Sequence, residues 1–213
     1  MSRVVRIKTK YLNIKIFDTK GGRMKELANL FYELGMLGRL KRLGPLLVGI
    51  DNPESIAQQN YRAAVIAFIL AKMEKANAEK TVMMCLLHDL ARTRIGDQNK
   101  VSMRYIDVKE VQKEVIKEQL ENLPKEIKEE FKSLLDEYNK RESKEAIVAR
   151  DADLLEGITQ AREYLEKGYK DMQIWIDRSH QVLKTKSAKK LAKDLLGISP
   201  NNWFKGLKVP PKH

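Results

Sequence analysis

The feature that most constrains the fold is the segment from Asp51-Asn52-Pro53-Glu54 to about Lys75, which is apolar almost all the way round a helix. A cap residue, a proline in the first turn and a carboxylate near the positive helix end predict a helix start at 51–54. Because a helix without a polar face has to be buried, we expect this one at the centre of the protein. Its longest apolar run, residues 63–71, is about half of the ~18 residues that a membrane span needs.

Most of the remaining chain also has helical periodicity. Residues 23–43 place Leu27, Leu30, Phe31, Leu34 and Leu37 on one face, and Leu43-Gly44-Pro45 should end that helix. Strand-like alternation occurs only in residues 3–17, which predicts a short strand or hairpin. Further helices are expected at 77–92, at 107–141 as a pair divided at Leu123-Pro124, at 143–167 ending at Gly168, and at 169–184 and 187–196. The predicted fold class is all-α, with a short, possibly β N-terminal extension.

The net charge of +12 points to an anionic partner, but it is concentrated at the two ends of the chain. Residues 1–26 and 184–213 carry sixteen of the 41 Lys and Arg residues, with Tyr11, Phe17, Trp203 and Phe204 among them. These ends could contact nucleic acid, or they could serve solubility alone. We divide the chain into a basic extension (1–22), a helical domain (23–196) and a basic, irregular tail (197–213). Residues 27–183, between the two basic ends, have a net charge of −1.

The location expected for the protein is cytoplasmic. A single cysteine, Cys85, fits a reducing compartment because it cannot form an internal disulfide. The N-terminus has early positive charge, but its apolar positions are interrupted by Lys8, Lys10, Asn13 and Lys15, so no secretory apolar region is expected. No membrane partner is expected.

Histidine is scarce, and His88 stands next to Asp89 at the end of an apolar helix. A buried His-Asp pair is costly unless both groups have partners. A divalent cation would satisfy both, although a capping or core hydrogen-bond role is the more ordinary explanation. His180 and His213 lie in charged or terminal surroundings and are expected at the surface.

A second acidic motif, Asp151-Ala152-Asp153-Leu154-Leu155-Glu156, lies within a helix that is otherwise suited to burial. Residues two apart on a helix point about 200° away from each other, so Asp151 and Asp153 must have different environments. Periodicity places Asp151 among large apolar side chains and Asp153 among small ones, where another helix can approach. Either carboxylate, if dry, needs a cation or an arginine, and a buried salt bridge satisfies this pattern as well as a metal.

Together, Pro53-Glu54-Ser55-Ile56-Ala57, His88-Asp89 followed by Gly96-Asp97, and the motif at 151–156 resemble the HD-domain metal-dependent phosphohydrolases, in particular the 5′-deoxynucleotidase branch. The resemblance covers about residues 27–183. It implies an HD-type helical bundle, a homodimer, and hydrolysis of a phosphate monoester, most specifically a nucleoside 5′-monophosphate. It also implies one divalent ion held by His88, Asp89 and Asp153, and it selects Asp153 over Asp151.

Two positions depart from the pattern of that family. Gln59 stands where the first histidine ligand is expected, and its amide oxygen is a neutral, weaker ligand. The resulting ligand set favours Mg²⁺ or Mn²⁺ over Co²⁺, Ni²⁺ or Zn²⁺. Arg92 replaces a glutamate and cannot exchange a proton near neutral pH, but it can bind phosphate. Either the site works with a harder ion and another base, or catalysis is lost and the fold binds nucleotide or nucleic acid.

Two further residues acquire roles from the resemblance. Asp97 is the expected catalytic residue for acid/base chemistry, with a turn or cap role as the alternative. Arg42 is expected to hold the substrate phosphate together with Arg92, although a cation at a solvated helix end is also common. Arg62, on the apolar central helix, should have an acidic partner.

Overall fold

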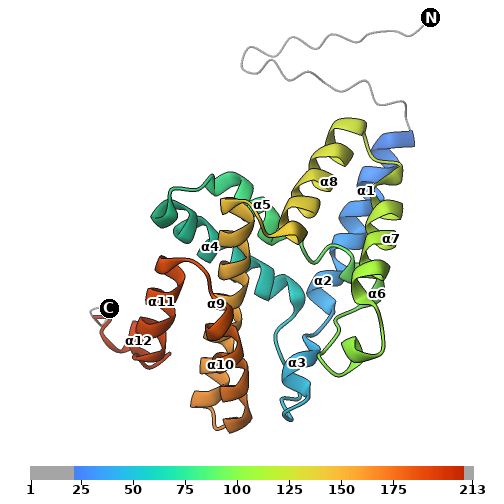
Figure 1. Ribbon diagram of the computed structural model, residues 1–213. Helices are drawn as coiled ribbons and strands as arrows, with labels where there is room; N and C mark the ends of the chain where they lie inside the picture. Colours follow the sequence, from blue (N-terminus) through green and yellow to red (C-terminus); the bar gives the residue numbers. More distant parts are fainter. Residues whose placement is uncertain (1–21, 209–213) are drawn as a thin grey trace, which may run out of the picture.

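The computed structural model of the protein describes residues 22–208, and this part of the chain is helical without a β-strand (Figure 1). This confirms the predicted all-α class. The α-helices in chain order are α1 (Gly22–Leu34), α2 (Met36–Arg39), α3 (Leu43–Leu46), α4 (Ile56–Glu74), α5 (Ala78–Leu87), α6 (Arg92–Ile95), α7 (Val108–Glu121), α8 (Lys125–Lys140), α9 (Lys144–Glu166), α10 (Gln173–Val182), α11 (Lys186–Leu196) and α12 (Asn202–Lys205), with short 3-10 helices at Ser102–Arg104 and Lys170–Met172.

The centre of the molecule is formed by α4 and α9, which pack against each other and against α5 (Figure 1). Their contact surfaces carry fully buried alanines, including Ala63 and Ala67 of α4 and Ala146 and Ala149 of α9. Small side chains allow two helix axes to approach closely. The predicted central position of the 53–75 segment and the close approach beside Asp153 are therefore both confirmed.

A second, smaller core joins α1, α7 and the turn after α5. It consists of the buried leucines Leu30, Leu90, Leu120 and Leu123. Leu90 directly follows Asp89, so this core holds the turn that carries the His-Asp pair. The turn with His88 and Asp89 lies where the two cores meet.

The central helix begins later than predicted. Its N-cap is Ser55, whose hydroxyl accepts from the Gln58 amide while the Gln58 side chain accepts from the Ser55 amide. This reciprocal capping box satisfies two amides at once and fixes the start of the helix at Ile56. Residues 51–54 lie outside the helix, and the Glu54 carbonyl accepts from the Arg42 amide.

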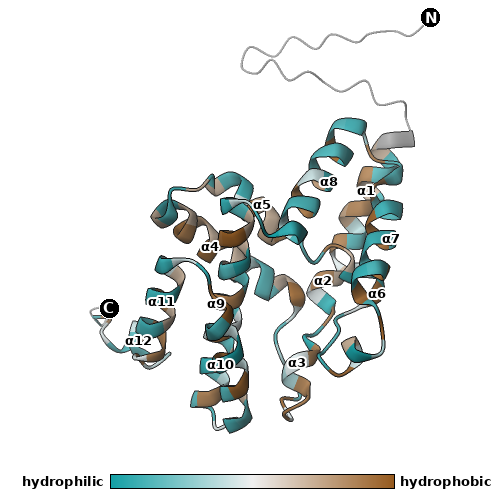
Figure 2. Ribbon diagram, in the orientation of Figure 1, coloured by the Kyte–Doolittle hydropathy of each residue, from teal (hydrophilic) through white to brown (hydrophobic). Residues whose placement is uncertain are grey.

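The prediction that α4 is buried on all sides is wrong for one face. Its inward residues are fully buried, but Tyr61, Val65, Phe68, Ile69 and Met73 are exposed. Figure 2 shows the corresponding apolar colour on α4. Hydropathy alone could not distinguish a core-facing side from an apolar outer side.

The predicted helix at 23–43 is divided into three. α1 ends at Leu34, next to Gly35, and α2 and α3 follow as single turns. Phe31 and Leu34 are exposed, whereas Leu30 and Leu37 are buried. Gly44-Pro45 lies inside α3, where a proline in the first turn lacks no hydrogen bond, so it does not act as the predicted helix stop.

The other helix boundaries are close to those predicted, with two differences. α5 ends at Leu87 rather than near Arg92, so His88 and Asp89 occupy a turn. The predicted irregular tail contains the short helix α12. The predicted strand or hairpin at 3–17 and His213 lie outside the described residues. Within residues 22–208, no helix is long and apolar enough to span a bilayer.

Candidate active site

Three segments distant in sequence bring the predicted ligand residues together. Gln59 lies near the start of α4, His88 and Asp89 follow α5, and Asp153 is in the middle of α9. The Gln59 amide nitrogen donates to Asp153 Oδ1 at 3.0 Å. His88 Nε2 is 3.4 Å from Asp89 Oδ1 and 3.6 Å from Asp153 Oδ1. The four residues therefore form one cluster between the central helices.

The orientation of His88 is fixed by the end of α5. Its Nδ1 lies 2.9 Å from the Cys85 carbonyl oxygen. A carbonyl only accepts, so Nδ1 carries the hydrogen and Nε2 faces the two carboxylates. Burial lowers the pKa of His88, but Asp89 and Asp153 outweigh burial and raise it above its usual value. The imidazole ring also packs against Tyr138 of α8, with centroids 5.1 Å apart.

Asp153 is surrounded by donors on three sides. Besides Gln59 and His88, Arg150 of the preceding helical turn pairs with Asp153 Oδ2. Burial alone would raise the pKa of this carboxyl, but the neighbouring His88 and the arginines hold it well below its usual range. The side chain is therefore a carboxylate at every physiological pH.

A network of arginines and carboxylates forms one side of the site. Asp97 Oδ2 accepts from Arg42 Nε at 3.2 Å and from the Leu43 amide at 2.7 Å, and Asp97 Oδ1 accepts from Arg92. Arg92 Nε also lies 2.8 Å from Asp89 Oδ1. Asp97 therefore binds both Arg42 and Arg92, the two arginines that the family resemblance assigns to the substrate phosphate.

The backbone before Asp97 explains the glycine at that point. Gly96 has a φ of +73°, a conformation that residues with a side chain rarely adopt. It ends α6 and turns the chain, so that Asp97 comes to lie beside Arg42 and Arg92. Asp97 is buried and both its oxygens accept hydrogen bonds, so its acid/base role stays a prediction.

The chemistry of the donor atoms fits a cation, although their present arrangement does not complete a site. In residues 22–208, no group of three or more His, Cys, Asp or Glu side chains could hold a metal ion as they stand. Two buried oxygens of the cluster, Asp89 Oδ2 and Gln59 Oε1, have no hydrogen-bond partner in that range. These oxygens lie in the same cluster as His88 Nε2, and carboxylate, amide and imidazole groups are all suitable ligands for a divalent ion.

Asp151 has a different environment. It is buried on the opposite side of α9, and its carboxylate accepts from the backbone amides of Lys184 and Thr185 at 2.7–3.1 Å. Its expected burial is confirmed. Its partners are backbone amides at the start of α11 rather than the cation or arginine expected from the sequence.

One turn beyond the Gln59–Asp153 contact, Arg62 of α4 binds Glu156 of α9 at 2.9 and 3.1 Å and Glu163 at 2.7 Å. The acidic partner predicted for Arg62 is confirmed. Burial raises the pKa of Glu156 to about 7, while Arg62 opposes that rise. This ion pair links the two helices that carry Gln59 and Asp153.

Two residues of the site were not assigned a role from the sequence. Arg150 precedes Asp153 by three positions, and that helical spacing was the signal available for it. Tyr138 lies on a charged, amphipathic helix, and no local signal marks it as a neighbour of His88.

Fold and site together define a protein that is all-helical over residues 22–208, with a partly buried cluster of His, Asp and Arg side chains beside its two central helices. A family model described as an HD domain matches residues 34–195. Human 5′-deoxynucleotidase HDDC2 is 30% identical over 138 residues, which are 64% of this chain and 67% of that protein. 5′-Deoxynucleotidase hdd1 from Schizosaccharomyces pombe is 35% identical over 149 residues, 65% of this chain and 75% of the relative.

Among solved structures, the PH0347 protein from Pyrococcus horikoshii is similar, with a TM-score of 0.69 and 27% identity over 80% of this chain and 98% of that one. The chain belongs to the HD-domain family, because the family model covers most of its length. The predicted family resemblance is thereby confirmed.

Proposed function

We propose that this protein is a phosphohydrolase that removes the phosphate from a nucleoside 5′-monophosphate, using one divalent metal ion. The class of activity follows from the family and from relatives named as 5′-deoxynucleotidases. The observation that carries the proposal for this chain is the net charge of the site. With a divalent ion bound, that charge is equal and opposite to the charge of a dianionic phosphate.

Equal numbers of carboxylates and guanidinium groups surround the site: Asp89, Asp97, Asp153, Arg42, Arg92 and Arg150. Their formal charges cancel. A divalent ion would therefore leave two positive charges, and a phosphate monoester carries close to two negative charges near neutral pH. A phosphodiester has one negative charge and would be matched less well. This supports a monoester substrate.

His88, Asp89 and Asp153 are the residues that would hold the ion, with the Gln59 amide oxygen as a weaker fourth ligand. A divalent ion bound there supplies a water of lowered pKa and stabilises charge on the phosphate. Whether or not Gln59 is a ligand, oxygen donors outnumber the single nitrogen donor. This supports Mg²⁺ or Mn²⁺, with Co²⁺, Ni²⁺ and Zn²⁺ as further candidates.

The arginines of the site would bind the phosphate. Arg42 and Arg92 each present further N–H donors beyond those held by Asp97, and a guanidinium pairs well with phosphate oxygens. Asp97 fixes both arginines and remains the proposed acid/base residue. To move a proton, it would have to exchange one of its present hydrogen bonds for one to the substrate or to water.

The direct test is an assay of nucleoside 5′-monophosphates with Mg²⁺, Mn²⁺ and Co²⁺, measuring released phosphate. We expect turnover by the full-length protein and its loss in His88→Ala, with His180→Ala, at an exposed position of α10, as the matched control. Turnover that survives His88→Ala would contradict the metal mechanism.

The alternative, a fold that binds nucleotide or nucleic acid without catalysis, is not favoured by relatives named as enzymes. It is tested by the double reversion Gln59→His with Arg92→Glu. An inactive wild-type protein and an active revertant would establish the alternative. Comparable activity in both would mean that the two departures are compatible with catalysis.

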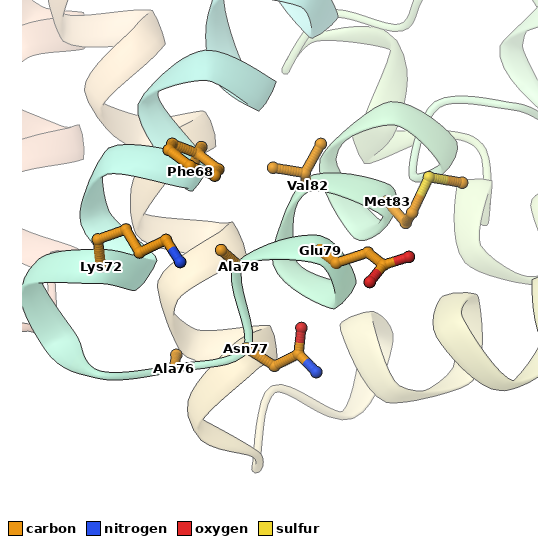
Figure 3. A pocket seen from close by; sticks show the side chains of 8 residues that line it. All are labelled: Phe68, Lys72, Ala76, Asn77, Ala78, Glu79, Val82 and Met83. Atoms are coloured by element: carbon orange, nitrogen blue, oxygen red, sulfur yellow. The ribbon is translucent and has the colours of Figure 1, made fainter.

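We also propose that the protein forms a homodimer through the outer face of α4. Phe68 of α4 and Val82 of α5 face each other across an apolar hollow (Figure 3). Lys72 and Glu79 line the same hollow and carry opposite charges, so a second copy related by a twofold axis can pair them reciprocally. Light scattering of wild type and Phe68→Asp tests this, and an unchanged mass would contradict it.

Nucleic-acid binding by the basic ends stays a prediction, as does the cytoplasmic location. In the described part of the tail, Trp203 and Phe204 are exposed and stack edge to face. If the ends bind nucleic acid, its affinity should fall steeply with salt and on removal of residues 1–22 and 198–213.

A further inference from the structure

We propose that Arg150 and Tyr138 form a second phosphate-binding element of the site, separate from Arg42 and Arg92. This inference rests on the proposed function and adds two residues to it. Arg150 comes from α9 and Tyr138 from α8, so the element is assembled by tertiary packing.

Arg150 has donors to spare. Within residues 22–208 its guanidinium binds Asp153 and lies beside the Tyr138 hydroxyl, which together occupy at most two of its five N–H groups. Its side chain is 34% exposed, whereas that of Asp153 is 11% exposed. The guanidinium therefore covers the carboxylate from the solvent side and leaves most of its donors available to an incoming anion.

Tyr138 provides an independent observation. The residue is only 5% exposed, and no acceptor in the described part of the chain takes a hydrogen bond from its hydroxyl. The ring lies against His88, and the hydroxyl lies beside Arg150. A guanidinium can only donate to that oxygen, so the hydrogen of the Tyr138 hydroxyl remains available to an acceptor.

A buried hydroxyl hydrogen without an acceptor is unfavourable, and its position beside a cation with open donors indicates an anionic ligand. A phosphate presents several oxygens and can accept from both side chains at once. Arg150 is also needed for the charge match described above, because without it the metal-loaded site would carry one positive charge instead of two.

The experiment is calorimetric titration of the full-length, Mn²⁺-loaded protein with inorganic phosphate, a product of the proposed reaction. Arg150→Gln should weaken phosphate binding roughly tenfold or more, and Tyr138→Phe severalfold, as expected for lost hydrogen bonds to a charged group. Mn²⁺ binding without phosphate should stay the same or tighten in Arg150→Gln, because a cation is removed from Asp153.

Two residues of α9, the helix that carries Arg150, provide matched controls. Arg162 pairs with Glu166, and the Tyr164 hydroxyl donates to Glu54, outside the cluster. Arg162→Gln and Tyr164→Phe should leave phosphate binding unchanged. Tyr164→Phe should lower the melting temperature more than Tyr138→Phe, because the Tyr164 hydroxyl donates to Glu54 and the Tyr138 hydroxyl donates to no group in the described part of the chain.

The outcomes separate this inference from the proposed function. Unchanged phosphate affinity in both Arg150→Gln and Tyr138→Phe would overturn it, as would a parallel loss of Mn²⁺ and phosphate binding, which would mean that Arg150 merely positions Asp153. A wild type that binds phosphate but hydrolyses no nucleotide would contradict the proposed function, and the two variants would still decide the role of Arg150 and Tyr138.

Discussion

Asp151 and Asp153 lie two residues apart on α9, and the comparison shows how one helix divides structure from function. Asp151 faces α11 and has its carboxylate satisfied by the backbone amides of Lys184 and Thr185. Asp153 faces α4 and the turn after α5, where its partners are the side chains of Gln59, His88 and Arg150. Backbone amides cannot be exchanged without moving the chain, whereas side chains can turn toward a ligand.

The largest expected effect distinguishes the two aspartates by activity. Asp153→Asn should lower kcat/KM for a nucleoside monophosphate on the order of a thousandfold, equivalent to roughly 4 kcal/mol, because it removes a charged metal ligand. Steady-state assays at saturating Mn²⁺ measure this. Activity within a few fold of wild type would show that Asp153 is as structural as Asp151.

The next largest effect distinguishes Asp151 from Asp153 by its influence on the stability of the protein. Asp151→Asn should lower the free energy of unfolding by about 3 kcal/mol, because the amide group can no longer accept all three backbone hydrogen bonds. For a chain of this size we expect a fall in Tm of roughly 6–12 °C. Thermal denaturation followed by circular dichroism tests this, and the folded fraction should retain its turnover. A loss of turnover without a loss of stability would reverse the assignment.

Glu156, another carboxylate of α9, should make the stability of the protein depend on pH. Its folded-state pKa of about 7 lies above its ordinary value of 4.5, because of burial. The folded chain therefore binds the proton more tightly in this window, so the unfolding free energy should fall as pH rises from about 4.5 to 7. The full contribution is about 3 kcal/mol.

The contribution of Glu156 to this pH dependence is obtained by comparing the wild type with Glu156→Gln. Arg62 faces Glu156 from α4, and Arg42 and Asp153 also act on its charge. Glu156→Gln should remove this part of the dependence, which denaturant unfolding of both proteins at pH 5 and pH 8 would measure. An identical difference between the two pH values in wild type and Glu156→Gln would show that Glu156 does not titrate in this range.

The same helix shows how far the sequence predicts the site. The spacing of Asp151 and Asp153 predicted opposite environments, and the apolar neighbours of Asp151 predicted its burial, both of which the structure confirms. The partners were not predictable, because the amides at 184 and 185 and the Gln59 side chain come from distant segments. Tyr138 was missed for the same reason, since its helix is charged and only packing turns it toward His88.

The sequence by itself determined the helical class, the order of the long helices, and the motifs that identify the family, because these depend on local periodicity and on residues in fixed order. Tertiary structure decided which face of α4 is covered, where α4 begins, and how Arg42, Arg92 and Arg150 are distributed over Asp97, Asp89 and Asp153. Those outcomes depend on the distance and direction between side chains of separate helices. Local pattern carries no information about such distances, so they are defined only when α4, α5 and α9 pack together.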